Sequence, residues 1–469
     1  MIKRQRTILF TSFVLIFLIA TPSVVLYTRG YRINFTERTI VQTGGISITP
    51  HPSNASVLLD GEEKEKTSFL FRDAVFRNIL PRTYNVRVEK EGYTSWEKFL
   101  VVREGKVEQV KNLRLFPKEP QVIALASDAT VLAISPNSKY TAVVNLNREM
   151  GTNELSLLRI SGNEAQKETI NLSFSQIDSA RFSKNSEVLL IESRLHGIAR
   201  VHTLQVGELQ NAVRWDAILR TVRPSVLRAS AILFPSDDPQ MLFALEQSKI
   251  GRLLFAITNS GKVTPTVLDE ISAFALTEKN IFYINTKGTL IKALLAGKPK
   301  DELDDEFAFP RAGRENARIV VRDDEKAVLI LQEGVLYLWE EEKSVRQVAK
   351  GQFIAGASFS PDREKFEYHS TTEIIIEWTR DIFGPPTRKI GDEERINAFS
   401  GVGNVVWLDA NYIGIQLPDR IGFAELDSRD KRNSAFYKIQ TSPQMLIVGP
   451  EKNTLLTGVE GNFAAILLE

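Results

Sequence analysis

A pattern of hydrophobic and polar positions repeats eight times over the last three-quarters of the chain. In each repeat an apolar, strand-like run ends at an acidic or amide residue, and a second apolar run follows. These turn residues are Asn137, Asn185, Asp237, Glu278, Asp323, Asp362, Asp409 and Glu451. Their spacing averages about 45 residues, the period of a four-stranded propeller blade. The pattern therefore predicts a mainly β protein in which residues 117–469 form a β-propeller.

Two of the repeats show the pattern residue by residue. Residues 357–362 read as a strand that ends in the type I turn signal Ser-Pro-Asp, and residues 364–369 and 373–378 read as the next two strands. Asp323 to Trp339 and Asp362 to Trp378 are both 16 residues, so the two tryptophans are expected at one structural position. We interpret them as residues that pack between blades, since buried aromatic side chains are more often core than binding platform.

The ends of the repeat region predict how the propeller closes. Only two strand-like runs follow Glu451, so the last unit lacks its outermost strand. The strand-like segment 120–125 is unassigned, and pairing it with residues 463–468 removes an open sheet edge. Eight blades is our first interpretation. Seven blades is the alternative, in which the irregular stretch 185–278 forms one distorted unit.

An uncharged, apolar run covers residues 8–27 and predicts a transmembrane helix, because 20 helical residues span a bilayer core. Lys3, Arg4 and Arg6 precede this run, so residues 1–7 are expected as a cytoplasmic tip. A cleavable signal peptide is the alternative, but Pro22 makes the sequence after Ala20 a poor cleavage site. We predict an uncleaved single-pass anchor, a membrane-proximal linker over 28–43 and an extracytoplasmic remainder.

Residues 44–116 carry the alternation of half-buried strands and predict a small β-sandwich. Asp60 and Gly61 form a tight-turn pair between two of these strands. The apolar members of the alternation are Ile46, Ile48, Val57, Leu59, Tyr84, Val86 and Val88.

The same segment resembles the PEGA domain. Residues 44–61 are similar to the opening of that family, in which a strand leads through a proline turn into a second strand ending at Asp-Gly, and residues 80–93 look like its closing half. The name-giving tetrapeptide is here Pro-Ser-Asn-Ala at 52–55, and the usual Gly after the second proline is Arg82. The resemblance implies an immunoglobulin-like or carbohydrate-binding-like module of envelope and surface proteins.

Composition narrows the class of protein. The 469 residues include no cysteine, which excludes thiolate metal sites, cysteine nucleophiles and disulfides, and favours a bacterial or similarly simple cell envelope. The formal net charge is +1, so there is no global field that would concentrate nucleic acid. We therefore expect the membrane, and an unknown envelope protein or cell-wall glycan, as partners, and no nucleic acid.

Residues for catalysis are sparse in the sequence. None of the four histidines has the i, i+4 helical spacing of a zinc hydrolase, and neither a nucleophile elbow nor a phosphate-binding glycine loop occurs. The acidic run 301–306 lacks the central Gly of a calcium loop. We predict no catalytic, cofactor-binding or metal-binding residues, and hence a non-catalytic envelope-anchored binding or scaffold protein. A polysaccharide-acting propeller hydrolase or lyase is the alternative.

One basic stretch is the candidate contact for a partner. It consists of Arg214, Arg220, Arg223 and Arg228, interleaved with apolar residues in the longest gap of the repeat. As an exposed insertion it would meet an anionic glycan, a lipid headgroup or an acidic protein. The alternative is an amphipathic insert that packs through Trp215 and Leu219 and leaves its arginines in solvent.

Overall fold

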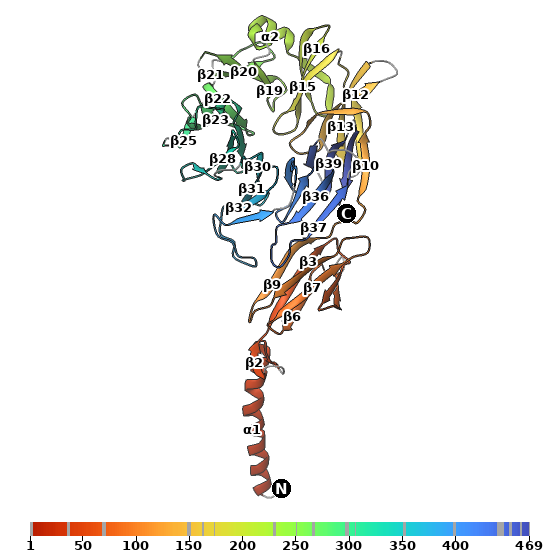
Figure 1. Ribbon diagram of the computed structural model, residues 1–469, viewed down its shortest axis with the longest axis vertical. Coiled ribbons are helices and arrows are strands. Elements are labelled where there is room, and N and C mark those ends of the chain that lie inside the picture. The colour runs from red at the N-terminus through yellow and green to blue at the C-terminus, as the bar shows by residue number, and fades with distance from the viewer. Residues whose placement is uncertain are drawn as a thin grey trace.

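The computed structural model describes residues 3–34, 38–67, 72–147, 152–161, 164–172, 174–227, 231–249, 251–264, 268–295, 300–304, 306–349, 353–396, 400–438, 445–449, 453–459 and 462–468. An N-terminal helix leads into a small β-sandwich and then into a larger assembly of β-sheets (Figure 1). The fold is mainly β, as the sequence predicts.

Helix α1 (Lys3–Thr28) projects from the β domains and is exposed along its apolar length. Its segment Leu9–Thr28 has a mean hydropathy of 2.4, which is long and apolar enough to cross a membrane, and a signal sequence has the same profile. The hairpin of β1 (Tyr31–Asn34) and β2 (Thr39–Gln42) follows at once. The Thr43 hydroxyl donates to the Gly30 carbonyl at 2.6 Å, so the end of the helix is tied to the start of the sandwich.

Two sheets form the sandwich, with strand orders β6-β3-β9 and β5-β4-β7-β8. The strands β3 and β9 pair in parallel, and the other pairs are antiparallel. The strands are β3 (Gly44–His51), β4 (Ser56–Leu59), β5 (Glu62–Lys66), β6 (Ala74–Ile79), β7 (Thr83–Glu89), β8 (Trp96–Val101) and β9 (Val107–Arg114).

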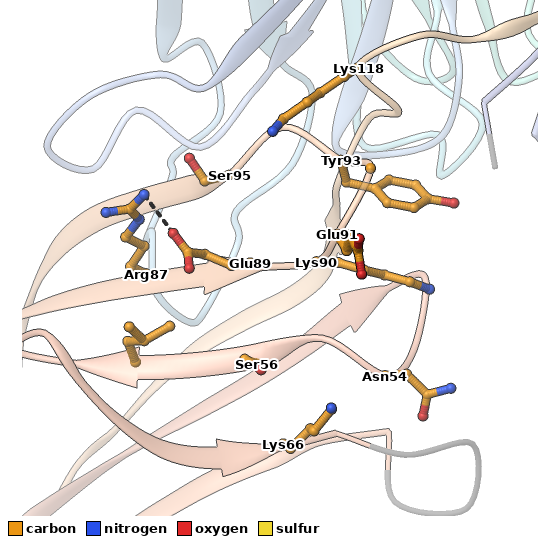
Figure 2. Close-up of a pocket in the computed structure, with 12 residues that line it drawn as sticks. Asn54, Ser56, Lys66, Arg87, Glu89, Lys90, Glu91, Tyr93, Ser95 and Lys118 are labelled. Carbon is orange, nitrogen blue, oxygen red and sulfur yellow. Dashed lines mark ion pairs between the residues drawn. The ribbon is translucent and has the colours of Figure 1, made fainter.

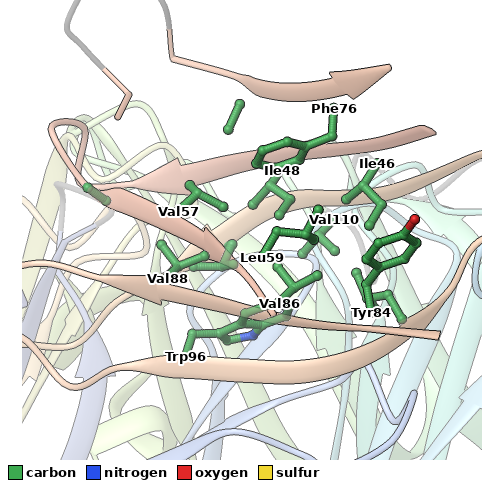
Figure 3. Packing of buried hydrophobic residues seen from close by; sticks show 14 of the residues in the cluster. Ile46, Ile48, Val57, Leu59, Phe76, Tyr84, Val86, Val88, Trp96 and Val110 are labelled. Atoms are coloured by element: carbon green, nitrogen blue, oxygen red, sulfur yellow. The ribbon is translucent and has the colours of Figure 1, made fainter. Parts of the chain in front are cut away.

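The core of the sandwich lies between the two sheets (Figure 3). All seven apolar residues of the predicted alternation are buried there, together with Phe76, Trp96 and Val110. Asp60 (φ 53°) and Gly61 (φ 85°) adopt the left-handed turn between β4 and β5. The period-2 pattern thus placed the inward faces of these strands correctly, because each strand buries one face only.

The remaining strands form seven further sheets, of which six have four strands. The first sheets contain β11 (Ala129–Ile134), β12 (Tyr140–Asn147), β13 (Thr152–Ser161) and β14 (Glu164–Thr169); then β15 (Gln176–Phe182), β16 (Val188–Leu195), β17 (Ile198–Gln205) and β18 (Glu208–Arg214). After helix α2 (Asp216–Val222) and the 3₁₀ turn η1 (Pro224–Leu227), a seven-stranded sheet contains β19 (Ile232–Pro235), β20 (Met241–Ser248), β21 (Gly251–Thr258), β22 (Leu268–Leu276), β23 (Asn280–Asn285), β24 (Leu290–Leu294) and β25 (Lys300–Asp304).

The chain continues through the 3₁₀ turn η2 (Arg314–Asn316) into the last sheets. They contain β26 (Arg318–Val321), β27 (Ala327–Gln332), β28 (Val335–Glu340) and β29 (Arg346–Gln347); β30 (Gly356–Phe359), β31 (Lys365–His369), β32 (Ile374–Trp378) and β33 (Glu393–Ile396); β34 (Asn404–Trp407), β35 (Tyr412–Gln416), β36 (Arg420–Glu425) and β37 (Ser434–Lys438); and β10 (Gln121–Ala126) with β40 (Asn462–Leu467), β39 (Thr454–Val459) and β38 (Met445–Val448).

These sheets follow one another around a common centre in the manner of a propeller (Figure 1). Strands of neighbouring sheets contact one another, with β11 beside β15, β22 beside β26, β30 beside β34 and β34 beside β38. Strand β10 pairs antiparallel with β40, with Val122 opposite Ile466, which is the pairing predicted for these two segments. Strand β11 in turn contacts β40.

The seven-stranded sheet accounts for the irregular stretch of the repeat. The start of β22 pairs with β21, with Leu254 opposite Leu268, and its remainder pairs with β23, with Ala275 opposite Phe282. One long strand therefore joins two groups of strands that the sequence pattern separates.

The repeated turn residue has a physical role. In four of the predicted turns its side-chain oxygen accepts a hydrogen bond from the backbone N–H two residues later, at 3.0 Å for Asn137 and 2.7 Å for Asp409. Asn185 and Asp362 do the same. In two repeats the residue that accepts this bond is one position later than predicted, Asp238 and Asp324. Near Glu278 the hydroxyl of Thr277 instead accepts from the backbone N–H of Asn280, three residues later. Glu451 lies outside the described residues.

Trp339 and Trp378 lie at equivalent places, each in the third strand of its sheet, β28 and β32. Both are buried, with 5% and 6% of their surface exposed, and both pack in apolar clusters. The interpretation of these residues as core is confirmed.

Candidate functional site

The predicted arginine contact lies on and around helix α2, which Figure 1 shows far from α1. Arg214 binds Asp216 through two nitrogens, at 3.0 and 2.9 Å. Arg220 donates to the carbonyl of Ala199 at 2.9 Å and lies 3.9 Å from Asp216. Arg228 lies outside the described residues. The arginines therefore sit close together in space, but they already have partners within the fold.

The main partner is a buried carboxylate, that of Asp216. Asp216 is fully buried, and Arg200 also pairs with it, at 2.9 Å. Although burial opposes ionisation, the hydrogen bonds from Arg214 and Arg200 lower the pKa of Asp216 to about 2. Arg223 pairs with Glu246 at 2.9 Å and lies over the ring of Phe255. Each described arginine of this cluster thus has a carboxylate within 4 Å, and the role of the cluster as a partner contact stays a prediction.

A junction between the sandwich and the propeller is built around a buried ion pair. Lys98, on β8, is completely buried, and its ammonium group lies 3.2 Å from Glu425 on β36. The same ammonium donates to the carbonyls of Lys431 at 2.6 Å, of Arg429 at 3.1 Å and of Asp427. A loop of the propeller therefore wraps around a lysine of the sandwich.

Burial and nearby charges shift the pKa values of two carboxylates at this junction, Glu425 and Asp427. Burial raises the pKa of Glu425, and the charge of Lys98 acts against that rise. The indole N–H of Trp96 also donates to Glu425, at 3.0 Å. Against the effect of burial, the hydrogen bond from Arg429 and the charge of Lys98 lower the pKa of Asp427. A buried cation that satisfies several acceptors fixes geometry, because losing any partner leaves a desolvated group.

Further contacts extend the junction along β9. Arg429 pairs with Glu108 at 3.1 Å, and the Tyr412 hydroxyl accepts from the backbone N–H of Arg114 at 2.9 Å. The hydroxyl of Tyr437 donates to the carbonyl of Pro117 at 2.5 Å. Phe116 stacks on Phe423, 4.9 Å between ring centroids, within the propeller core. The sandwich and the propeller are thus joined by a packed interface as well as by the chain.

The sequence analysis missed this junction, although a signal was present. Trp96, Lys98 and Leu100 alternate on one face of β8, and the other two members of this face are core residues. A lysine at an inward position of an otherwise apolar face indicates a buried partner. The identity of that partner, Glu425, is more than 300 residues away and follows only from the tertiary fold.

A second candidate site is a hollow of about 880 Å³ on the outer face of the sheet β5-β4-β7-β8 (Figure 2). Ser56 and Arg87 lie on its floor, and Arg87 pairs with Glu89 at 2.5 Å. At one side the ammonium of Lys90 donates to the carbonyl of Ser53 at 2.9 Å and lies 5.2 Å from the ring of Tyr93. An open polar hollow beside an aromatic ring is suited to binding a polar ligand.

Neither site contains a clustered set of metal ligands. Within the described ranges, no group of three or more His, Asp or Glu side chains is placed to hold a metal ion. Burial lowers the pKa of His202, so its imidazole is neutral at pH 7. His369 lies 2.9 Å from Glu367 within the buried strand β31.

Comparison with protein families identifies the sandwich. Residues 43–115 match the family described as PEGA domain, within one residue of the predicted bounds at each end. The chain therefore contains a PEGA domain, which covers a minor part of its length. At the two departures from the family pattern, Asn54 takes a left-handed backbone (φ 62°), and Arg82 pairs with Asp60 at 2.5 Å beside the β4–β5 turn.

No curated protein matches the chain. Among solved structures, a chain of the mitotic checkpoint complex is 11% identical with a TM-score of 0.43, over 76% of this chain and 96% of that one. The computationally designed Ika8 protein is 9% identical with a TM-score of 0.47, over 75% and 100%. The WD40 β-propeller domain of Doa1 is 11% identical with a TM-score of 0.41, over 74% and 96%. Such distant similarities carry no functional argument.

Proposed function

We propose that this protein is a membrane-anchored, non-catalytic scaffold of a cell envelope, which holds its propeller outside the membrane for a protein or glycan partner. Helix α1 is the anchor in this proposal, the PEGA domain is a rigid spacer, and the propeller is the binding unit. The PEGA domain and the propeller-like fold support a binding or scaffold role.

The junction around Lys98 is the observation that carries the proposal. A flexible tether between the two domains would need no buried ion pair, whereas this interface buries a lysine, aligns a propeller loop along β8 and packs Phe116 into the propeller. Such an interface gives the propeller a defined orientation relative to α1. A defined orientation is useful to a protein that presents a surface.

We further propose that the propeller has eight blades. Strand β22 is then both the outer strand of the third blade and the inner strand of the fourth blade, and β10 completes the eighth blade. Deleting residues 462–469 removes β40 and leaves β10 and β39 without their shared partner. We expect the propeller of this variant to lose cooperative unfolding in urea. A truncated protein that unfolds like the parent would contradict closure by this pair.

Membrane topology can be tested with single cysteines, because the natural chain has none. Lys343→Cys places a thiol on an exposed propeller side chain, and Gln5→Cys places one before the apolar segment. In intact bacterial spheroplasts, a membrane-impermeant maleimide should label the first variant, and should label the second only after lysis. Labelling of the propeller only after lysis would overturn the extracytoplasmic part of the proposal.

Binding and catalysis can be separated with the full chain purified in detergent. We expect cross-linking in membranes followed by purification to capture a stable partner, and we expect no soluble products from isolated wall polysaccharide. Release of reducing or unsaturated ends that persists through repeated purification would instead favour the hydrolase or lyase alternative. A heat-denatured sample serves as the control.

A further inference from the structure

A pocket of about 430 Å³ opens on the propeller between the β20–β21 turn, the β23–β24 turn and the connection that leads into η2. Four of its ten lining residues are cationic, namely Arg252, Lys287, Arg311 and Arg314, and one, Glu315, is acidic. The whole chain is almost neutral, so this excess is a local departure. The pocket shares no residue with the arginine stretch around α2, with the junction or with the hollow on the PEGA domain.

Arg314 is the buried member of these four cations. Only 7% of its surface is exposed, and its guanidinium donates to three backbone carbonyls, those of Pro310 at 3.2 Å, Thr286 and Phe309. Carbonyl oxygens satisfy hydrogen-bond donors but carry no formal charge. Because no described carboxylate pairs with Arg314, its buried positive charge is not balanced within the described part of the protein.

The neighbours of Arg314 add to this imbalance. Burial lowers the pKa of Arg314, and the nearby charge of Arg311 lowers it further. Arg252 donates to the carbonyl of Ser272 at 3.2 Å, and none of the other three cations forms an ion pair among the described residues. Cations that repel one another in a partly enclosed site attract an anion strongly.

Glycines let the backbone come close to these side chains. A Cβ atom at Gly288 would lie 2.8 Å from a guanidinium nitrogen of Arg314, and one at Gly251 would lie 2.9 Å from Thr286. Both glycines have positive φ angles, of 103° and 114°, that other residues rarely adopt. The pocket is therefore shaped by its turns, with the buried guanidinium held in one orientation.

The pocket faces away from the PEGA domain. Neighbouring strands of a blade are antiparallel, so successive turns alternate between the two ends of the propeller. At the junction, Asp409 follows β34 and Asp427 follows β36, the first and third strands of one blade. The pocket is formed by the turns after β20 and β23, each of which is taken as the second strand of its blade. The pocket thus belongs to the end that the PEGA domain leaves uncovered.

We propose that this pocket binds an oxyanion, a phosphoryl or carboxylate group, between the guanidinium of Arg314 and the cations of Lys287 and Arg311. The planar guanidinium groups offer paired donors that match either group, and Thr286 and Ser272 add polar atoms at the wall. The inference goes beyond the scaffold role, and its test does not depend on where α1 resides.

The test is a titration of the purified full chain at constant ionic strength, with chloride replaced by inorganic phosphate in one arm and by glucuronate in the other. The variant Lys287→Gln/Arg311→Gln removes two exposed cations and spares Arg314, which holds the loop together. Heat of binding and thermal shift give the apparent Kd. We expect saturable binding of at least one anion, weakened about tenfold or more in this variant.

The matched control is Lys326→Gln/Lys343→Gln, which removes two exposed cations of the same propeller that pair with glutamates. This control should bind like the parent. Phosphate binding without glucuronate binding assigns a phosphoryl ligand, and the reverse assigns a carboxylate. The proposal is overturned if neither anion saturates, if the pocket variant binds like the parent, or if the control variant loses binding equally.

Discussion

Two basic clusters of the propeller differ in what lies between their cations. Around α2, Arg200, Arg214 and Arg220 surround the buried carboxylate of Asp216. In the pocket beside η2, Arg314 is buried against carbonyls and faces Arg311. The first cluster is visible in the sequence, because Arg214, Arg220 and Arg223 are close together along the chain. The second is assembled from residues spread over 252–314. The cluster that the sequence shows is the one whose cations have a carboxylate partner within the fold.

The comparison shows that the density of basic residues in a sequence does not measure electrostatic potential. A potential that attracts a ligand needs cations without nearby carboxylates, and only the tertiary fold decides which carboxylates are near. The four predictions below test this difference, in order of decreasing expected effect.

The largest effect is expected at Lys98, a buried charged residue that has a charged partner, as Asp216 does. Lys98→Met leaves Glu425 buried without its ion-pair partner and three carbonyls without a donor. We expect a loss of about 3–5 kcal/mol in the free energy of unfolding, measured in urea, and faster proteolysis between the two domains. Lys111→Met, on β9, is the exposed control. Equal stability of the two variants would mean that the ion pair of Lys98 does not stabilise the junction.

A somewhat smaller loss is expected when the balanced cluster is broken. Asp216→Asn keeps the shape of the side chain but leaves Arg200 and Arg214 without a charge partner, and both of these arginines are partly exposed to water. We expect a loss of about 2–3 kcal/mol, determined by urea unfolding. If the variant were as stable as the parent, the α2 cluster would not be held by its buried carboxylate, and the contrast with the pocket would disappear.

Acid should affect the same cluster. The pKa of Asp216 is about 2 in the folded state, below its ordinary value of 3.8, so its ion pairs stabilise the fold above that ordinary value. This contribution should be lost as the pH falls from about 4 towards 2. Unfolding free energies measured across this range should fall less steeply in Asp216→Asn than in the parent. Parallel curves would contradict the assignment.

The smallest effects should have opposite signs in the two clusters. Arg214→Gln removes an ion pair and should cost up to about 1 kcal/mol, whereas Arg311→Gln removes a like charge from beside Arg314 and should be neutral or stabilising by about 0.5 kcal/mol. Thermal unfolding of both variants at low salt gives the comparison. A clear loss of stability in Arg311→Gln would mean that Arg311 has a stabilising partner.

The local features of the fold follow from the sequence because they depend on local periods. Alternation predicts the inward faces of the PEGA strands, as at Val86 and Val88, and the repeated acidic or amide turn residue predicts strand ends near Asn137 and Asp362. The one-residue offset at Asp324 arises because two acidic residues stand side by side there, and the pattern does not say which one bonds. The pocket and the partner of Lys98 at the junction could not be predicted, because only the packing of segments far apart in the sequence brings these residues together.

The tie between Thr43 and Gly30 has a mechanical consequence. The hydroxyl and the backbone N–H of Thr43 both bond the carbonyl that follows α1, and Thr43 leads directly into β3 of the sandwich. Together with the interface around Lys98, this makes the chain from helix to propeller a series of stiff parts. In a bilayer, any change in the tilt of α1 with membrane thickness would then move the far end of the propeller sideways, as the tip of a lever moves. The thickness of the surrounding lipid would set where that end is held.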